Sequence, residues 1–481
     1  MTKLIKDMTT EERASIIELI KREVIPAIGC TEPIAVALCV AKATEILGCK
    51  PHRIEAHLSA NILKNAMGVG IPGTGMIGLP IAIALGALIG KSEYGLEVLK
   101  ECTPDAVEAG KRMIADEAIS IKLKEGITEK LYIEITAFGA TTAASSATTT
   151  TTGATTTAAS GATTASAATT AASCAASAAT TASSCTQTAT AIIAGGHTNF
   201  IYLSHNGEVL LDAPLKSTAE QNGNKTALTL KKVYDFATTA PLEEIEFILE
   251  AQRLNKAAAE TSFKGRYGHQ LGRTLKESTR EMSILGNNTF SKILSYTTAA
   301  CDARMAGVMV PVMSNSGSGN QGITATLPIT IYAEENNKSR EELIRALTLS
   351  HLTVIYIKQS LGRLSALCGC VVAATGSSCG ITYLMGGGYN QISFAVQNMI
   401  ATLTGMVCDG AKPSCSLKIA SGVSTSLLSA ILAMEEQCVS SVEGIIDNDV
   451  DKSILNLTRI GSESMNETDH AVLDIMTHKG C

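Results

Sequence analysis

The hydrophobic pattern of this chain changes from helical to strand-like and back, and this change constrains the fold more than any single motif. Helical patterns dominate the N-terminal part and return from Pro241 onward. Between Ala106 and Asp212 short runs typical of β-strands take over, at 131–138 and 192–203, and Asn206–Gly207 then predicts a hairpin turn. The pattern predicts an α+β fold in which a smaller α+β domain is inserted into a mainly helical body.

Local signals place individual elements. Thr10, followed by two glutamates, begins a capped helix that ends near Pro26, and Arg53–Leu58 has the pattern of a short strand. The most apolar stretch, 76–89, is shorter than the roughly 20 residues that a membrane span needs. It therefore predicts a core helix.

The segment 139–190 consists almost entirely of Ala, Thr, Ser and Gly and has no charged residue. Such a segment cannot bury enough apolar surface to offset the entropy of ordering it, so we assign it no chemistry. It lies within the predicted small α+β domain, 101–215. We expect the residues on either side, 1–100 and 216–481, to form the N-terminal and C-terminal parts of the helical body.

The composition favours a small-molecule substrate and a reducing compartment. The formal net charge of the 481 residues is −6 and no long Lys/Arg run is present, which argues against nucleic-acid and membrane partners. The 14 cysteines are scattered among helical segments, and the chain starts without the apolar core of a signal peptide. We expect a cytoplasmic protein with free thiols, and a homo-oligomer stays open.

Three cysteines in the last quarter of the chain, Cys368, Cys408 and Cys415, lie in glycine-punctuated loops. Gly410 and Pro413 cannot both continue a helix, so the chain turns between two of the thiols. Cys415 then begins an apolar helix, whose N-terminus favours a thiolate. Three such thiolates can hold a [4Fe–4S] cluster and leave its fourth iron open to a substrate as a Lewis acid.

The spacing alone leaves alternatives open. Free cysteines are among the most buried residue types, so the three could be ordinary core residues. The triplet Cys368–Gly369–Cys370 makes the first ligand ambiguous, and Cys379 is a weaker candidate. The chain has no Cys-x-x-Cys pair, the signature of zinc ribbons and ferredoxins.

A fourth thiol, Cys30, lies in a Gly-Cys-Thr-Glu-Pro turn just before a predicted helix. A helix N-terminus lowers the pKa of a thiol, so Cys30 is a candidate proton acceptor, although a packed core residue would look the same. Glu32 could orient a substrate amine or simply complement the helix dipole.

Two glycine-rich loops complete the candidate site. The loop 313–322 is dense in backbone N–H groups, hydroxyls and amides without charge, which suits a substrate carboxylate but also a solvent loop. The loop 68–75 matches the dinucleotide G-x-G-x-x-G pattern only formally, because no buried strand precedes it and Pro72 falls where the helix should open. His197 is the only histidine in a polar loop, and we expect a structural role for it.

Four of these segments together resemble the L-cysteine desulfidase family, which is related to the iron–sulfur L-serine dehydratases. They are Gly29-Cys30-Thr31-Glu32-Pro33, Asn61-Ile62-Leu63-Lys64-Asn65-Ala66-Met67-Gly68, Asn315-Ser316-Gly317-Ser318-Gly319-Asn320-Gln321-Gly322 and Cys408-Asp409-Gly410-Ala411-Lys412-Pro413-Ser414-Cys415. The resemblance covers the chain except 139–190, where the family leads us to expect a short connection between two strands. The related dehydratases have a cluster domain beside an α+β domain.

The resemblance implies α,β-elimination of L-cysteine to pyruvate, ammonia and hydrogen sulfide, without pyridoxal phosphate. It places the family's base on Cys30 and the ligands of a [4Fe–4S] cluster on Cys368, Cys408 and Cys415, in the helical domain 216–481. The same motifs supply the predicted substrate-binding residues: Thr31, Glu32, Asn61, Asn65, Ser314, Asn315, Ser316, Gly317, Ser318 and Asn320.

Two other functions stay open from the sequence. An L-serine dehydratase differs mainly in its leaving group, hydroxide in place of sulfide. A non-catalytic redox or iron sensor would hold a cluster or reactive thiols without a substrate pocket, and the polar loop 314–322 argues against it.

Overall fold

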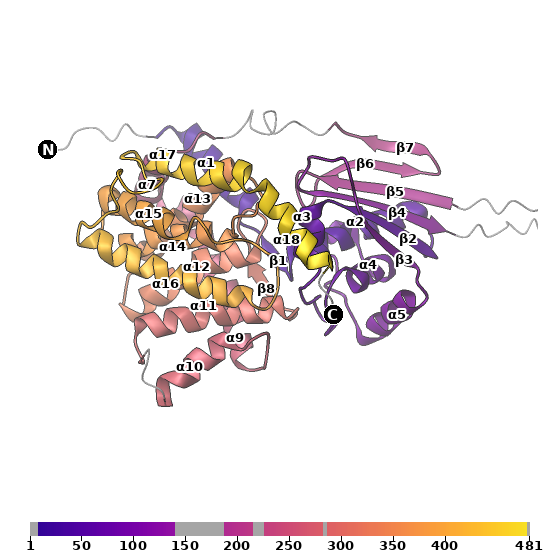
Figure 1. Ribbon diagram of the computed structural model, residues 1–481. Helices are drawn as coiled ribbons and strands as arrows, with labels where there is room; N and C mark the ends of the chain where they lie inside the picture. The colour runs from indigo at the N-terminus through magenta and orange to yellow at the C-terminus, as the bar shows by residue number, and fades with distance from the viewer. Residues whose placement is uncertain (1–7, 140–186, 215–225, 282–285, 479–481) are drawn as a thin grey trace, which may run out of the picture.

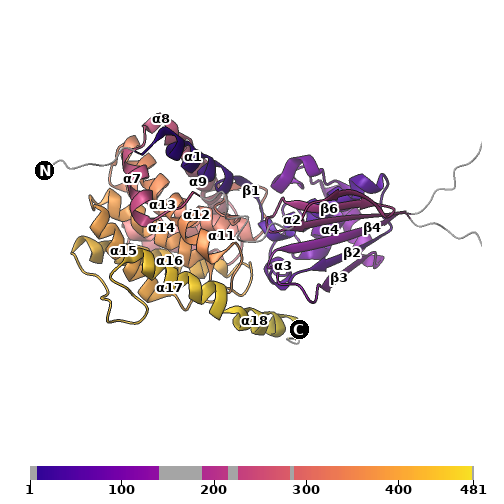
Figure 2. The same cartoon turned by 90° about the horizontal axis from the view of Figure 1, so that it is seen from above.

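The computed structural model describes residues 8–139, 187–214, 226–281 and 286–478. Two bodies lie side by side, one built of helices and the other of a sheet covered by helices (Figure 1). The view from above shows the same two bodies, with the C-terminal helix reaching from the first to the second (Figure 2). The predicted α+β class is confirmed.

The sheet has six strands in the order β3-β2-β4-β5-β6-β7. Only β2 and β3 run parallel, and the other neighbours are antiparallel. The strands are β2 (Arg53–Leu58), β3 (Ile119–Leu123), β4 (Tyr132–Gly139), β5 (Gln187–Ala194), β6 (Phe200–His205) and β7 (Glu208–Asp212). Alternate residues of β4 are buried, as expected for a sheet with one covered face.

Helices cover that face. Helix α2 (Thr31–Leu47) packs on β4 and β5, α4 (Leu79–Leu88) packs on α2, and α5 (Pro104–Ala115) packs on α4. Two further short helices, α3 (Ala60–Ala66) and the 3-10 helix Ser92–Glu97, contact α2. The apolar stretch at 76–89 therefore contains a core helix, as predicted.

Most strand predictions are confirmed, but one is wrong. The run 192–203 is not one strand, because Gly195, with φ of 71°, starts a turn that separates β5 from β6. The segment 139–190 is not wholly without structure, since Gly139 ends β4 and residues 187–190 begin β5. Ala189 is buried opposite Ala137 in that pair. The rest of the segment, with Cys174 and Cys185, lies outside the described residues.

The helical body is built around α14 (Gly369–Leu384), which packs against α12, α13, α15 and α16. Its other helices are α1 (Thr10–Glu23), α7 (Leu230–Thr239), α8 (Leu242–Ile245), α9 (Leu249–Phe263), α10 (Leu271–Glu281), α11 (Thr289–Met305), α12 (Gly319–Glu335), α13 (Arg340–Leu361), α15 (Tyr389–Leu403), α16 (Cys415–Met434), α17 (Val450–Arg459) and α18 (Asn466–His478), with short 3-10 and π segments at Glu246–Ile248 and Ile460–Ser464. The N-terminal helix is capped as predicted, but its capping box is formed by Thr9 and Glu12, and Thr10 is the first helical residue.

The chain crosses between the two bodies next to a two-stranded sheet, β1 (Pro26–Ile28) with β8 (Pro311–Met313). It enters α2 directly after β1, so α2, β2 and α4 pack with the six-stranded sheet although they precede residue 100. The boundaries 1–100, 101–215 and 216–481 stay predictions. Helix α18 packs against α3, which ties the end of the described chain to the sheet-containing body (Figure 1).

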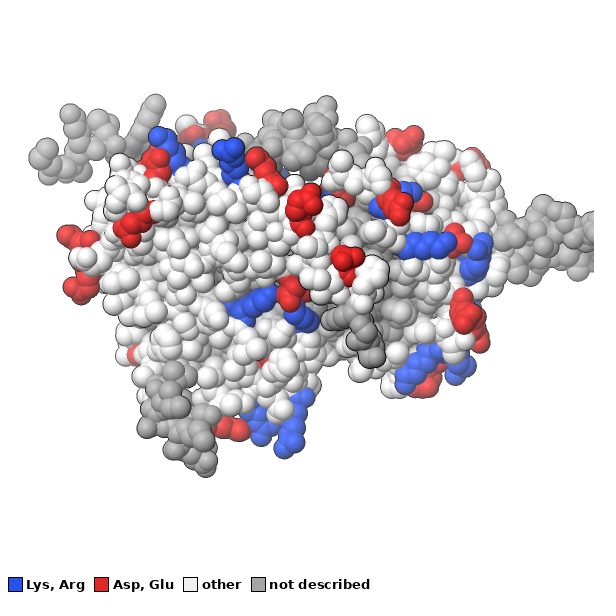
Figure 3. Space-filling view, viewed as in Figure 1, with Lys and Arg blue, Asp and Glu red and all other residues white. Residues whose placement is uncertain are grey.

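The surface charges and the most apolar long helix bear on which partners the protein could bind. Lys, Arg, Asp and Glu are interspersed on the face in Figure 3, and much of the helical body there is uncharged. In the part of the chain that the structure describes, α16 is the one helix long and apolar enough to cross a membrane. A core helix of a soluble protein passes the same test, and α16 packs against α11, α14 and α15.

Candidate functional site

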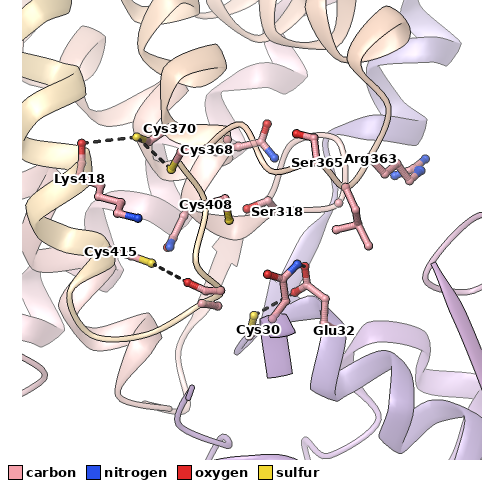
Figure 4. A pocket seen from close by; sticks show the side chains of 18 of the residues that line it. Cys30, Glu32, Ser318, Arg363, Ser365, Cys368, Cys370, Cys408, Cys415 and Lys418 are labelled. Carbon is pink, nitrogen blue, oxygen red and sulfur yellow. Dashed lines mark hydrogen bonds between the residues drawn. The ribbon is translucent and has the colours of Figure 1, made fainter. Parts of the chain in front are cut away.

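A pocket of about 100 Å³ lies where loops of the helical body meet the start of α2 and the end of α3. Its side chains fall into two groups, with thiols of the helical body on one side and Cys30 and Glu32 on the other (Figure 4). The residues that line the pocket include Cys30, Glu32, Asn65, Arg304, Gly317, Ser318, Asn320, Gln321, Lys358, Arg363, Cys368, Cys370, Cys408, Cys415 and Lys418.

Backbone hydrogen bonds bring Cys368 and Cys408 together. The Cys368 N–H donates to the Met406 carbonyl at 2.9 Å, and the Cys408 N–H donates to the Ala366 carbonyl at 2.6 Å. The loop before α14 is thereby paired with the loop after α15. Cys415 is the first residue of α16, as predicted, so the loop before α14 and the connection from α15 to α16 present three thiols to one pocket.

Cys368 and Cys370 differ in their hydrogen bonds. Their sulfurs lie 3.4 Å apart, and the Cys370 sulfur also lies 3.4 Å from the Lys418 carbonyl oxygen, to which a thiol can donate. The hydrogen bond with Cys370 lowers the pKa of Cys368 to about 7, whereas the same bond and burial raise the pKa of Cys370. Cys379 is fully buried within α14 and does not line the pocket.

Lysines surround these thiols. The Lys64 ammonium, buried in an ion pair with Asp469, donates to the Cys408 carbonyl at 3.3 Å. Burial raises the pKa of Cys408 to about 11, and the Lys64 charge opposes this shift. Burial also raises the pKa of Cys415, against the charges of Lys412 and Lys418. The helix N-terminus is predicted to favour a thiolate at Cys415, and burial opposes that effect.

The thiols of Cys368, Cys408 and Cys415 have the chemistry of iron–sulfur cluster ligands. Within the described ranges, no three His, Cys, Asp or Glu side chains are grouped closely enough to hold one ion. Ligands of a cubane bind different irons, so they lie farther apart than the ligands of one ion, and thiolates are the usual ligands of such clusters. Three thiols around one pocket have this character.

Cys30 is the N-cap residue of α2 and is 2% exposed. Its thiol donates to Glu32 Oε2 at 3.0 Å. Burial and the Glu32 charge raise its pKa well above the ordinary value, while Arg304 opposes them. The predicted lowering by the helix N-terminus is thus wrong, because desolvation and a neighbouring carboxylate outweigh the dipole.

The neighbours of Glu32 tie the two bodies together. Glu32 Oε1 accepts a hydrogen bond from Asn65 Nδ2 at 3.2 Å, and Thr31 donates to the Gly317 carbonyl at 2.6 Å. Asn65 Oδ1 is buried without a partner, as are the amide oxygens of Asn320 and Gln321. Three acceptors without donors therefore belong to side chains that line the pocket.

The polar loop 313–322 divides into two parts. Ser314 donates to the Ile25 carbonyl at 2.6 Å, Asn315 donates to Nδ1 of the buried His351 at 3.0 Å, and Ser316 donates to Asn315 Oδ1 at 2.8 Å. These three side chains are used inside the protein and do not line this pocket. Gly317, Ser318 and Asn320 do line it.

The structure brings together some predicted residues and separates others. Cys30, Glu32, Asn65, Gly317, Ser318, Asn320, Cys368, Cys408 and Cys415 line the pocket. Thr31 lies next to it, and Asn61 instead donates to Asp469 at 3.0 Å. His197, for which we expected a structural role, is buried, and burial lowers its pKa to about 4.

Sequence reasoning missed Arg304, Gln321, Lys358 and Lys418, all of which line the pocket. Gln321 lies in the polar loop and could have been included with its neighbours. The other three lie on ordinary helical stretches and carry no local signal, because only the packing of distant helices brings them to the site.

The chain is similar to one known family and to several bacterial proteins. The serine dehydratase alpha chain family matches residues 205–474. A UPF0597 protein of Phocaeicola vulgatus is 69% identical over 470 residues, 98% of this chain and 99% of that protein. The UPF0597 proteins of Porphyromonas gingivalis and Shewanella pealeana are 50% and 40% identical, over 98% and 96% of this chain and 100% and 98% of theirs.

Proposed function

Since the chain belongs to the serine dehydratase alpha chain family, we propose that it is a lyase that converts L-cysteine to pyruvate, ammonia and hydrogen sulfide without pyridoxal phosphate. The observation that carries this proposal is the single pocket that joins the Cys30–Glu32 pair to the thiols of Cys368, Cys408 and Cys415. An elimination needs a base at the Cα proton and a Lewis acid at the leaving group, and the two groups supply one each.

Glu32 and Asn65 bind the substrate ammonium in this proposal. The Glu32 carboxylate is buried, and the unpartnered Asn65 Oδ1 adds an acceptor beside it. A bound ammonium neutralises the Glu32 charge, which is one of the two main causes that raise the pKa of Cys30. The substrate therefore lowers the pKa of the base that will act on it.

Cys30 then takes the Cα proton. Its sulfur lies 3.0 Å from the carboxylate that holds the ammonium, and the ammonium nitrogen is bonded directly to Cα. In this proposal the proton that Cys30 carries in the free protein passes to solvent, because Glu32 must stay ionised to hold the ammonium. This route assigns the resting thiol to the free protein and the thiolate to the substrate complex.

A [4Fe–4S] cluster would be held by Cys368, Cys408 and Cys415 and, when bound, would supply an open iron as the Lewis acid for the departing sulfide. We choose Cys368 over Cys370 because the family resemblance places a ligand on Cys368 and because the Cys370 sulfur lies 3.4 Å from the Lys418 carbonyl oxygen, to which its thiol can donate. The cysteines that the structure describes are all free, which suits the cytoplasm as the site of the reaction.

The second candidate is L-serine dehydratase, favoured by the description of the matching family. Hydroxide and hydrosulfide leave by the same elimination, so Cys30 and Glu32 would keep their roles. We prefer L-cysteine because sulfide is the softer leaving group and binds iron more readily.

Anaerobic reconstitution with iron and sulfide, followed by separate assays of L-cysteine and L-serine, tests the proposal. We expect pyruvate and hydrogen sulfide in equal amounts from L-cysteine, at a higher kcat/KM than pyruvate from L-serine. The reverse preference would establish the dehydratase instead. A bound cluster with no pyruvate from either amino acid would contradict both functions.

A further inference from the structure

Arg304 is a buried cation without a carboxylate partner. Its side chain reaches the pocket from the end of α11 and is 3% exposed. Its Nε donates to the Gly29 carbonyl at 3.0 Å, which fixes the guanidinium beside the turn that carries Cys30. In the described part of the chain no Asp or Glu forms an ion pair with it.

The other cations of the pocket are accounted for. Arg363 pairs with Glu23 at 3.0 Å, and Lys418 pairs with Asp409. Lys358 has no carboxylate partner either, but burial lowers its pKa to about 8, so it can lose its charge. An arginine cannot lose its proton in this way, and an unpaired buried charge is costly. Of these cations of the pocket, Arg304 therefore gains most from a bound anion.

The surroundings of Arg304 form a seat for that anion. The guanidinium lies against Gly319, the first residue of α12, where a Cβ would overlap its Nε. A cation at a helix N-terminus faces the positive end of the dipole, and an anion bound there would interact favourably with both. The glycine leaves the room in which the guanidinium lies.

We infer that Arg304 binds the α-carboxylate of an amino-acid substrate. This inference rests on the proposed function and adds the opposite pole of its site. Glu32 and the unpartnered amide oxygen of Asn65, whose Nδ2 donates to Glu32, would bind the ammonium, and Arg304 would bind the carboxylate. The pocket then recognises both charges of an α-amino acid, and Cys30 lies next to both of the groups that bind them. A small-molecule thiol that has no carboxylate should bind weakly.

Binding of L-alanine and L-alaninamide, measured by NMR titration, tests this inference without requiring turnover. Both ligands carry the ammonium, but only L-alanine carries the carboxylate, and neither has a leaving group. The unsubstituted protein should prefer L-alanine. We expect Arg304→Gln to weaken the binding of L-alanine about 10- to 100-fold, as for loss of a charge-assisted hydrogen bond. The affinity for L-alaninamide should stay nearly unchanged. Arg304→Lys should recover part of the loss.

Two further variants sharpen the test. Gly319→Ala keeps the charge but displaces the guanidinium, so it should reduce the preference for L-alanine as Arg304→Gln does. Arg345→Gln is the matched control, because Arg345 is a part-buried arginine that donates to the Ala237 and Ala240 carbonyls and does not line the pocket. It should keep the preference. Thermal unfolding identifies any variant that fails to fold, and Arg304→Lys then carries the test.

The inference is overturned if Arg304→Gln binds L-alanine as tightly as the unsubstituted protein, or weakens both ligands equally. It is also overturned if Lys358→Met, and not Arg304→Gln, abolishes the preference. Failure of the proposed elimination would look different, since pyruvate would be absent while binding of L-alanine still depended on Arg304.

Discussion

Cys30 and the thiols of the helical body share one pocket but differ in their charged neighbours: Cys30 lies between a carboxylate and Arg304, whereas lysines lie near Cys408 and Cys415. The Cys30 sulfur lies against the Glu32 carboxylate, which raises its pKa together with burial. The thiols of Cys408 and Cys415 are also buried, but lysines oppose the effect of burial there. The carboxylate beside Cys30 favours the protonated thiol until a substrate cation binds. The lysines near Cys408 and Cys415 favour thiolates, which are the form that binds a metal.

The difference shows that position at a helix start does not decide what a thiol does. Cys30 and Cys415 both lie at the beginning of helices. Burial raises the pKa of each, so the sign of the nearest charge makes the distinction.

Loss of one ligand should abolish the cluster. We expect Cys408→Ala and Cys415→Ala to bind no [4Fe–4S] cluster, because two remaining thiolates cannot hold a cubane with one open iron. Iron content and visible absorbance after anaerobic reconstitution measure this. Cys379→Ala is the control, since Cys379 does not line the pocket. Cluster loss in Cys370→Ala but not in Cys368→Ala would reassign the first ligand.

Removing the charge of Glu32 should increase the reactivity of the Cys30 thiol but decrease the turnover of L-cysteine. In Glu32→Gln we expect the pKa of Cys30 to fall, so iodoacetamide modifies Cys30 faster at pH 8, as followed by peptide mass spectrometry. Turnover of L-cysteine should nevertheless drop about 100-fold, because the ammonium loses its counter-charge. Slower modification of Cys30 in this variant would contradict the role of the carboxylate.

Removing one lysine from the thiol group should weaken the cluster without abolishing it. Lys418 pairs with Asp409 and donates to the Val407 carbonyl at 2.7 Å, and its charge lowers the pKa of Cys368. We expect Lys418→Met to release iron to a chelator several-fold faster than the unsubstituted protein. Lys231→Met, on the exposed face of α7, should release iron at the ordinary rate. Equal rates of iron release from the two variants would show that Lys418 does not stabilise the cluster.

Deletion of 140–186, replaced by a short turn, should have the smallest effect. Gly139 and Gln187 are partners at the end of the β4–β5 pair, so a short connection can join the strands. We expect unchanged iron content and turnover and a similar melting temperature. Loss of the cluster in this variant would show that the segment supports the pocket, contrary to our assignment of no chemistry.

The sequence predicted the parts of this site that depend on local signals. Gly410, Pro413 and the apolar run after Cys415 mark a turn into a helix, and Pro33 marks the helix that follows Cys30. These signals act within a few residues, and the structure places the helix starts where they were predicted.

The sequence could not predict contacts between distant segments. Arg304 meets the Gly29 carbonyl across 275 positions, and Asn61 meets Asp469 across 408. The polar loop shows the same limit, because Asn315 and Asn320 are the same residue type in one motif. Packing turns the first toward His351 and leaves the second at the pocket.

Bound iron and released pyruvate can be measured in the same reconstituted samples of the unsubstituted protein and of Cys30→Ser. A base acts on the substrate and not on the metal, so we expect equal iron in both and a rate from L-cysteine lower by a factor of about 100 or more in Cys30→Ser. Pyruvate at the unsubstituted rate, or loss of iron from Cys30→Ser, would contradict it.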